Sequence, residues 1–291
     1  MEVRVRKAAV IVATVLAAAV GGLAPASAIT GNYTPDDQHD YVGLVFFYDA
    51  AGNPAQVCSG SLLSPTVFLT AGHCTAGFSS ARVYFAQDAG GAYDPELGID
   101  PVTGFPFTCL PQPDPCVTSS QMYNYGFTTL GPADSQDVGV VILDQPVYLE
   151  TYASLAAAGS LDRLATRRGH QDATFTVSGY GVSRINPVGA EAFYQRLMAT
   201  TQLVNLESAK TAGYNIQLSS APGGGSGGTC FGDSGGPVLY GSTDIVVAVS
   251  SFVTRNCRGV NYAYRTDQVA VIAWILALAG DEADQISVVE I

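Results

Sequence analysis

The chain has 291 residues, of which 47% are hydrophobic and 13% are charged, and its formal net charge at pH 7 is −12. This length permits one large β domain or two smaller lobes. Such an acidic balance argues against proteins that bind nucleic acid or anionic lipid, because both classes present a basic surface.

The first residues have the three parts of a secretory signal peptide. Basic residues at the start precede an apolar run over residues 8–20, and residues 26–28 read Ala-Ser-Ala, a small-residue cleavage site. A membrane anchor is the alternative, but the run is shorter than the roughly 20 residues that a spanning helix needs. We therefore predict a signal peptide over residues 1–28 and an extracellular protein that begins at Ile29 and has no part in a membrane.

Short runs rich in Val, Ile, Tyr and Phe follow, separated by Gly, Pro, Asn and Asp, which is the pattern of strands joined by turns. The predicted strands are residues 41–48, 66–70, 82–86, 138–143, 174–177, 216–218, 238–240 and 245–252. Many short strands favour a barrel or a sandwich. Residues 153–165 and 267–279 are predicted as helices, the second with Asp267 as its N-cap and Gly280 as its stop.

Two long loops interrupt this pattern. Residues 88–116 carry Gly, Pro and acidic residues, and residues 219–229 are rich in Gly and Ser. A Gly/Ser stretch is typical of a flexible linker, but this one runs into a cysteine and a constrained turn, which favours a role in lining a pocket. The acidic residues of the first loop lack a calcium-binding spacing, and the six cysteines form no Cys-x-x-Cys pair. We predict neither a metal nor a cofactor.

Residues 232–237 read Gly-Asp-Ser-Gly-Gly-Pro, a run whose glycines permit a tight loop with exposed amides. Ser234 is therefore a candidate nucleophile beside an oxyanion hole, and the alternative is a glycine-rich turn. Three histidines could serve as its base. We expect His39 and His170 to be solvated, because both lie in polar runs. His73 instead ends an apolar strand, next to a cysteine.

Residues 70–74, Thr-Ala-Gly-His-Cys, and residues 232–237 together resemble the histidine and serine motifs of the trypsin/chymotrypsin-like serine proteases of the secreted, bacterial type. The resemblance covers the chain after the signal peptide. It implies two six-stranded antiparallel β-barrels with the active site between them and a C-terminal helix. The implied bounds within the peptidase domain 29–291 are about 29–150 for the first barrel, about 170–266 for the second, and 267–291 for the helix and an acidic tail.

The resemblance also implies the catalytic residues. Its order of His, Asp and Ser places the acid between the two motifs, where Asp137 opens an apolar run. The triad is then His73, Asp137 and Ser234, with the main-chain N–H groups of Gly232 and Ser234 as the oxyanion hole. A strand-start aspartate that caps a turn is the alternative for Asp137.

Disulfides and substrate-binding residues follow from the same resemblance. The implied disulfides are Cys58–Cys74, Cys230–Cys257 and, outside the family-wide pattern, Cys109–Cys116. The implied substrate-binding residues are Gly228, Thr229, Ser251, Phe252, Val253 and Gly259, with the wall position taken by Val253, or by Phe252 if the alignment slips. No carboxylate stands at the pocket base, Gly228, so a preference for Lys or Arg is not expected. Arg255 and Arg258 leave a preference for acidic side chains as an alternative.

Residues 29–32, Ile-Thr-Gly-Asn, resemble the start of the mature family members. In that family the new α-ammonium group pairs with the acid before the serine, which is Asp233 here. We hypothesise that removal of the signal peptide itself frees Ile29, with no separate propeptide. The alternative is that Asp233 only accepts hydrogen bonds from nearby turn amides.

These observations predict a secreted serine endopeptidase that acts on protein or peptide substrates through an acyl-enzyme, works as a monomer and binds no nucleic acid. One alternative is an inactive protease homologue that serves as a binding module. Another is an esterase of the α/β-hydrolase kind, but that class uses Gly-x-Ser-x-Gly and the order Ser, Asp, His. In this chain Ser234 follows Asp233 and comes last.

Overall fold

The computed structural model describes residues 29–90, 116–131, 133–164, 173–186, 189–221, 224–254, 257 and 259–291. Some of the predictions fall outside the described residues. These concern the signal peptide 1–28, most of the 88–116 loop, Cys109, His170, Arg255 and Arg258.

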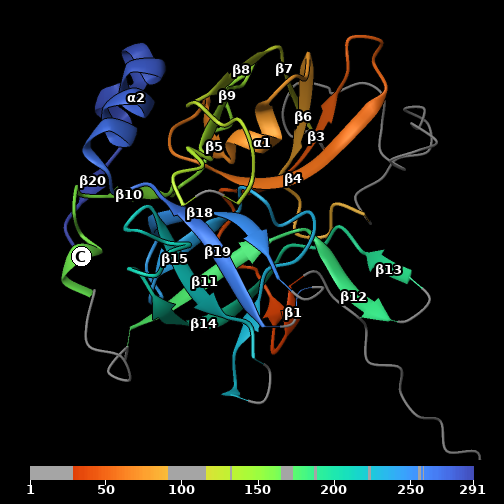
Figure 1. Cartoon of the computed structure of the whole chain (residues 1–291). Helices are drawn as coiled ribbons and strands as arrows, with labels where there is room; N and C mark the ends of the chain where they lie inside the picture. Colours follow the sequence, from red (N-terminus) through yellow and green to blue (C-terminus); the bar gives the residue numbers. More distant parts are fainter. Residues whose placement is uncertain are drawn as a thin grey trace, which may run out of the picture.

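Strand pairing divides the described chain into two β-barrels, which lie against each other (Figure 1). The strands of the first are β3 (Val42–Tyr48), β4 (Pro54–Leu62), β5 (Val67–Thr70), β6 (Ser80–Tyr84), β7 (Val117–Ser119), β8 (Gln121–Asn124) and β9 (Gly139–Ile142). They run in the order β7–β6–β3–β4–β5–β9–β8, with every pair antiparallel. β7 and β8 are separated by Ser120 alone and pair with opposite ends of the sheet, so this barrel is nearly closed.

The second barrel closes on itself. Its strands are β11 (Thr174–Gly179), β14 (Leu197–Asn205), β15 (Asn215–Ser219), β17 (Pro237–Tyr240), β18 (Ile245–Val253) and β19 (Val260–Arg265). They run in the order β17–β11–β14–β15–β19–β18, and β18 pairs again with β17. The predicted all-β fold of two antiparallel barrels is confirmed.

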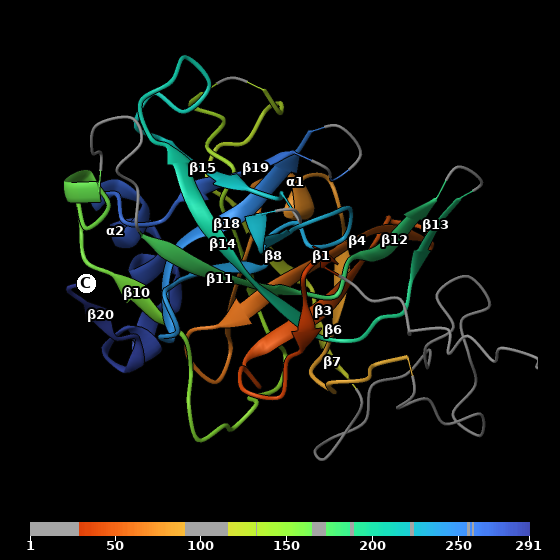
Figure 2. The same cartoon turned by 90° about the horizontal axis from the view of Figure 1, so that it is seen from below.

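Short strands lie around these barrels. β10 (Ser154–Ala156) pairs in parallel with β18 and with β20 (Val288–Val289), while β2 (Thr34–Pro35) pairs with one end of β14. β1 (Thr30–Gly31) pairs with β16 (Gly227–Gly228). β12 (Val182–Asn186) and β13 (Gly189–Ala192) form a hairpin that projects away from the barrels (Figure 2).

Burial follows the position of each strand. β14 alternates between buried and more exposed residues along its length, as expected for a strand with one face on the core. Every residue of β3 is buried, so both of its faces are covered. The larger core cluster contains Phe46 and Val141 of the first barrel together with Leu239 and Val249 of the second, so one continuous apolar interior joins the two barrels.

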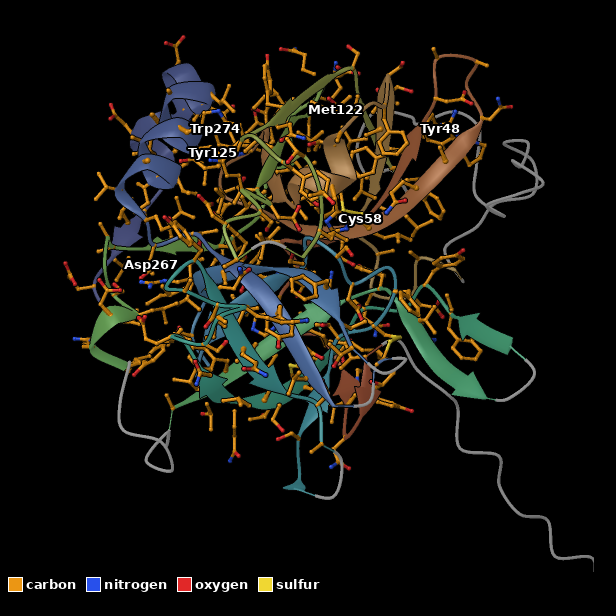
Figure 3. All side chains as sticks on the ribbon, viewed as in Figure 1. Tyr48, Cys58, Met122, Tyr125, Asp267 and Trp274 are labelled. Carbon is orange, nitrogen blue, oxygen red and sulfur yellow. A yellow bond between two sulfur atoms is a disulfide. The ribbon has the colours of Figure 1, made fainter. Side chains whose placement is uncertain are left out.

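The C-terminal helix α2 (Val269–Ala279) packs against the first barrel, beside β8 and β9 (Figure 1). Val271 and Ile275 are buried in the shared core, and the Trp274 ring meets the Tyr125 ring edge-on at 5.2 Å between centroids (Figure 3). The helix ends at Gly280, whose φ of 54° favours glycine, as predicted. A short 3₁₀ segment, η4 (Gly280–Gln285), follows. No helix in the described part of the chain is long and apolar enough to cross a membrane.

Two predictions about helices were wrong. The described part of the predicted helix 153–165, which ends at residue 164, forms β10, a turn and the 3₁₀ segment η2 (Asp162–Leu164), because pairing of β10 with β18 and β20 outweighs local helix propensity. The N-cap of α2 is Gln268 and makes no side-chain capping bond. The carboxylate of Asp267 instead accepts hydrogen bonds from the buried Arg265 guanidinium at 2.8 Å and from the Leu161 N–H at 2.8 Å.

The prediction that His39 is solvated was also wrong. Only 5% of His39 is exposed, and its Nδ1 lies 2.9 Å from both carboxylate oxygens of the fully buried Asp36. Ser178 donates to the same carboxylate at 2.5 Å. Burial raises the pKa of Asp36, but the hydrogen bonds and the charge of His39 outweigh it, so this pKa lies below its ordinary value. Asp36 is close to His39 in the sequence, but its burial against the distant Ser178 has no local signal.

Candidate active site

His73 lies on a single helical turn, α1 (Gly72–Thr75), that comes directly after β5. A Cβ atom at Gly72 would lie 2.8 Å from the Phe127 Cβ and 3.0 Å from the Val138 carbonyl oxygen. Glycine therefore allows the turn to pack closely against the segment that carries Asp137. This close approach is the physical reason for the glycine before His73 in the Thr-Ala-Gly-His-Cys motif.

Asp137 is fully buried and contacts the His73 ring at Nδ1. The two carboxylate oxygens lie 3.1 Å and 2.9 Å from His73 Nδ1, and one of them accepts the His73 main-chain N–H at 2.7 Å. Ser251, on β18 of the second barrel, donates its hydroxyl to the same carboxylate at 2.5 Å. Because a carboxylate can only accept hydrogen bonds, its contact with His73 Nδ1 favours a proton on Nδ1. His73 Nε2 is then unprotonated and free to take a proton.

Ser234 lies in a tight loop between β16 and β17. Gly232 and Gly235 have φ values of 95° and 80°, in the region that favours glycine. A Cβ at Gly235 would also lie only 2.0 Å from Thr70 Oγ1. The glycines of the motif thus have two separate physical reasons, backbone conformation and close packing of the loop on the first barrel.

Two disulfides fix the segments around the site. Cys58 is bonded to Cys74, next to His73, and Cys230 is bonded to Cys257. Both pairs confirm the prediction. Cys116 is also in a disulfide, and its predicted partner Cys109 lies outside the described residues.

The main-chain N–H groups of Gly232 and Ser234 are the two donors predicted for the oxyanion hole. Within the described chain, the N–H groups of Gly232 and Ser234 donate to no protein acceptor. The carbonyl oxygen of Phe231 accepts the Val182 N–H at 2.6 Å. Since a trans peptide directs its C=O and N–H in opposite directions, the Gly232 N–H points away from Val182. Two unpaired donors on the Ser234 loop are compatible with the predicted oxyanion hole.

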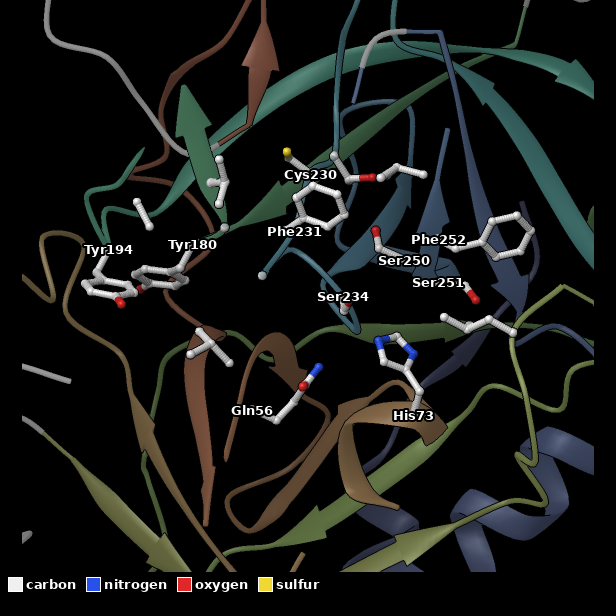
Figure 4. Close-up of a pocket in the computed structure, with 18 residues that line it drawn as sticks. Gln56, His73, Tyr180, Tyr194, Cys230, Phe231, Ser234, Ser250, Ser251 and Phe252 are labelled. Carbon is white, nitrogen blue, oxygen red and sulfur yellow. The ribbon is translucent and has the colours of Figure 1, made fainter. Parts of the chain in front are cut away.

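A cavity of about 570 Å³ lies between the barrels and brings these groups together. His73 and Ser234 both line it, and Figure 4 shows the Ser234 side chain beside the His73 imidazole. The Cys74 sulfur lies 3.7 Å from both His73 Nε2 and the Ser234 carbonyl oxygen, which confirms how closely the two segments approach. Among the described contacts there is no hydrogen bond from the Ser234 hydroxyl to His73.

The predicted substrate-binding residues divide into two groups. Thr229, Ser251, Phe252 and Val253 line the cavity, whereas Gly228 and Gly259 do not. A Cβ at Gly228 would lie 2.7 Å from Asn261 Nδ2, so buried side chains fill the space next to it. The sequence analysis did not assign to the cavity residues of other segments, namely Gln56, Val57, Leu130, Tyr180, Gly181, Val182, Ala192 and Tyr194, nor Cys230, Phe231 and Ser250, which neighbour predicted residues in the sequence.

Asp233 and Ile29 are both fully buried. The Asp233 carboxylate accepts the N–H groups of Gly181 and Cys230, each at 2.8 Å. Burial raises the pKa of Asp233 to about 7, although these two hydrogen bonds act in the opposite direction. Ile29 reaches the same region because Thr30 pairs with Gly228 in the β1–β16 ladder.

One group of side chains in the described chain has the proximity of metal ligands: Cys58, His73 and Cys74. The two cysteines are bonded to each other, so neither offers the thiolate that a metal would need. This group carries no metal site.

Comparison with known proteins gives one family model and several serine proteases as matches. The family model described as trypsin matches residues 112–275. A CLIP domain-containing serine protease B10 of Anopheles gambiae is 28% identical over 127 residues, which are 43% of this chain and 35% of that protein. Serine protease 7 of Drosophila melanogaster is 27% identical over 229 residues, which are 72% of this chain and 53% of that protein. The chain thus matches about a third and about half of the length of these two relatives.

Solved structures share the fold at low sequence identity. HL collagenase is 18% identical with a TM-score of 0.61, covering 87% of this chain and 98% of its own. The scabies mite inactivated protease paralogue S-D1 is 15% identical with a TM-score of 0.55, covering 90% and 100%. Human heparin binding protein is 17% identical with a TM-score of 0.57, covering 87% and 97%. Such identities establish the fold alone, since one fold hosts several functions.

Proposed function

The chain belongs to the trypsin family of serine proteases, and from this premise we propose that it is an active, secreted serine endopeptidase. Its catalytic residues are His73, Asp137 and Ser234. The N–H groups of Gly232 and Ser234 form its oxyanion hole.

One observation carries this proposal. The buried Asp137 carboxylate holds His73 Nδ1 at 2.9 Å, in a cavity that His73 shares with Ser234 and two unpaired amides. A strand-start aspartate that only caps a turn does not need to hold an imidazole. A serine in an ordinary glycine-rich turn does not need a base and two free donors beside it.

The proposed reaction uses these groups in sequence. His73 Nε2 takes the proton of the Ser234 hydroxyl as its oxygen attacks the peptide carbonyl, and the resulting oxyanion accepts the N–H groups of Gly232 and Ser234. His73 then gives the proton to the leaving amine as the C–N bond breaks. Water repeats the attack on the acyl-enzyme, returning the proton to Ser234 and releasing the new carboxylic acid.

A fluorophosphonate probe tests the nucleophile, and casein tests the reaction class. The chain that begins at Ile29 should be labelled by the probe and should hydrolyse casein, and Ser234→Ala should do neither. Ser226→Ala is a matched control, because Ser226 is a buried serine of the preceding loop that does not line the cavity.

Folded protein that takes no label would support the inactive binding module instead. An inactivated paralogue shares this fold, which makes that second candidate worth testing. Labelling without casein hydrolysis would indicate an esterase.

The cavity composition supports a preference for uncharged side chains before the cleaved bond. None of the residues that line the described cavity carries a carboxylate, and Val253 and Phe252 contribute apolar surface on one side. A library of peptide substrates should therefore show cleavage after small-to-medium or aromatic residues. Dominant cleavage after Lys or Arg would overturn this assignment.

Export is proposed to activate the enzyme. Signal removal after residue 28 frees the Ile29 amine, which pairs with Asp233 and so stabilises the loop that carries Gly232 and Ser234. Burial of both residues and the absence of a cationic partner for Asp233 in the described chain support this. Mass spectrometry of secreted, active protein should give an N-terminus at Ile29, and a different N-terminus would refute the hypothesis.

A further inference from the structure

Ser59, on β4, lies against the loop that carries the nucleophile and is fully buried. Its main-chain N–H donates to the Ser234 carbonyl oxygen at 2.8 Å. Its own carbonyl oxygen accepts the Thr70 hydroxyl at 2.8 Å. The backbone of Ser59 is thus fixed relative to both the serine loop and the strand that leads to the histidine.

The Ser59 side chain adds two contacts that its backbone does not supply. Its hydroxyl donates to the Gly232 carbonyl oxygen at 2.9 Å and accepts the Tyr180 N–H at 3.0 Å. A hydroxyl has one proton, so the bond to Gly232 uses its only donor capacity. Gly232 and Tyr180 both line the cavity, although Ser59 itself does not.

These contacts hold the one residue of the oxyanion hole that has no side chain. The Gly232–Asp233 peptide unit is held at both edges, because Ser59 donates to its carbonyl and its N–H donates to the Cys230 carbonyl oxygen at 3.1 Å. The preceding peptide unit, Phe231–Gly232, includes the Gly232 N–H. It is held by Val182, whose N–H donates to the Phe231 carbonyl oxygen. Glycine has wide conformational freedom, and Gly232 has a φ of 95°, so bonds of this kind are needed to hold the peptide units on either side of it in one orientation.

We propose that Ser59 is a positioning residue for the oxyanion hole, acting through the Gly232 carbonyl to keep the Gly232 N–H aligned with the developing oxyanion. This inference rests on the proposed protease function. The simpler possibility is that the hydroxyl only satisfies buried turn groups and has no effect on the reaction. The two differ in which kinetic quantity changes when the hydroxyl is removed.

Ser59→Ala is expected to lower kcat by about 10-fold to 100-fold, less than the roughly 10²–10³ lost with a direct oxyanion donor. KM should stay within about twofold, because the contact acts on the transition state. Affinity for a peptidyl boronic acid, whose tetrahedral adduct occupies the oxyanion hole, should fall by a similar factor to kcat. Ser61→Ala is the matched control, because Ser61 is equally buried on the same strand and its hydroxyl has no partner in the described chain.

Several outcomes would overturn the proposal: an unchanged kcat in folded Ser59→Ala, an equal loss in Ser61→Ala, or a loss confined to KM. If Ser59→Ala does not fold, Ser59→Thr keeps the donor and must retain kcat and boronate affinity, and their loss in folded protein would refute the proposal. If wild-type protein neither takes the fluorophosphonate nor cleaves casein, the proposed function fails separately. A crystal structure of Ser59→Ala then decides the positioning role, since a Gly232–Asp233 peptide that keeps its orientation would exclude it.

Discussion

The carboxylate of Asp137 accepts hydrogen bonds from three groups, namely the main-chain N–H and Nδ1 of His73 and the hydroxyl of Ser251. Two of these come from the first barrel and one from the second. The carboxylate therefore sets the orientation of the imidazole and also connects the barrels at the site. An acceptor with no hydrogens of its own is essential for the Nδ1 contact.

Asp137→Asn should lower kcat on the order of 10⁴-fold while leaving the fold intact. The substituted amide keeps one acceptor oxygen, but its NH₂ group cannot accept the Nδ1 proton and so favours the wrong imidazole tautomer. Peptide hydrolysis measured beside thermal unfolding checks this, with Ser251→Ala as a graded comparison that removes one donor and leaves the carboxylate. A kcat within tenfold of wild type in folded Asp137→Asn would exclude Asp137 as the triad acid.

Among the residues that the structure describes, Arg196 has the largest of the fully buried side chains, and it lies between the barrels. Its guanidinium donates to the carbonyl oxygens of Asp36, Val42 and Phe85 at 3.0–3.2 Å and to a carboxylate oxygen of Asp40 at 3.0 Å. These contacts join the start of β14 to the first barrel. A planar guanidinium carries five N–H donors on three nitrogens, whereas a Lys ammonium has three donors on a single nitrogen and cannot reach all four of these partners at once.

We therefore expect Arg196→Lys to lower the free energy of unfolding by about 2–4 kcal/mol, because buried carbonyl groups lose their donors. Urea unfolding in a Ser234→Ala background measures this without self-digestion. Arg163→Lys changes an exposed arginine in the same way and should shift stability by less than about 0.5 kcal/mol. If the two substitutions changed the free energy of unfolding equally, the contacts of Arg196 would not stabilise the fold.

At the level of elements, the sequence predicted those features that local chemistry determines. Runs rich in Val, Ile, Tyr and Phe located β3, β9 and β18 within one or two residues, and Gly280 located the end of α2. The segment 153–165 was predicted wrongly because its strand exists only through pairing with β18 and β20. The roles of Ser59 and Arg196 were also missed, since each depends on partners more than a hundred positions away. Local patterns carry no trace of such partners.

The tail after α2 is a second example of a role that appears only in the structure. Glu282 accepts the Thr66 N–H at 3.1 Å and the Thr66 hydroxyl at 2.9 Å. Ile286 is buried, and β20 pairs with β10. The tail therefore connects the loop before β5 in the first barrel to the sheet of the second.

Glu282→Ala should lower the free energy of unfolding by about 1–3 kcal/mol, because the Thr66 N–H and hydroxyl lose their acceptor. Asp281→Ala removes an exposed neighbouring charge that has no hydrogen bond in the described chain, so it is expected to leave stability unchanged. Urea denaturation of both variants in the Ser234→Ala background provides the comparison. If both variants unfold at the wild-type midpoint, the contacts between Glu282 and Thr66 do not stabilise the fold.

At the scale of the whole molecule, the N-terminal segment and the serine loop meet although they are far apart in the sequence. Thr30 pairs with Gly228, and its hydroxyl lies within hydrogen-bond distance of two carbonyl acceptors, those of Gly228 and Cys257, at 3.3 Å and 3.2 Å. Asp233, a few residues further along, is a buried acid whose pKa is raised by burial to about 7. Its ordinary pKa is 3.8. Below about pH 7, the carboxyl group of Asp233 is therefore protonated in the folded protein.

This shift predicts how proteolytic removal of residues 1–28 changes the effect of pH on stability. With those residues attached, the folded state binds a proton that the unfolded state has lost between pH 4 and pH 7, so stability should fall by up to about 4 kcal/mol as pH rises through this window. In the form that begins at Ile29, the α-ammonium group keeps the carboxylate ionised, and the loss should appear only above about pH 8, as the amine deprotonates. Urea unfolding of the two Ser234→Ala forms at pH 5, 7 and 9 tests this, and Asp233→Asn should abolish the fall in the longer form. The same pH dependence in both forms would rule out a pairing of Ile29 with Asp233.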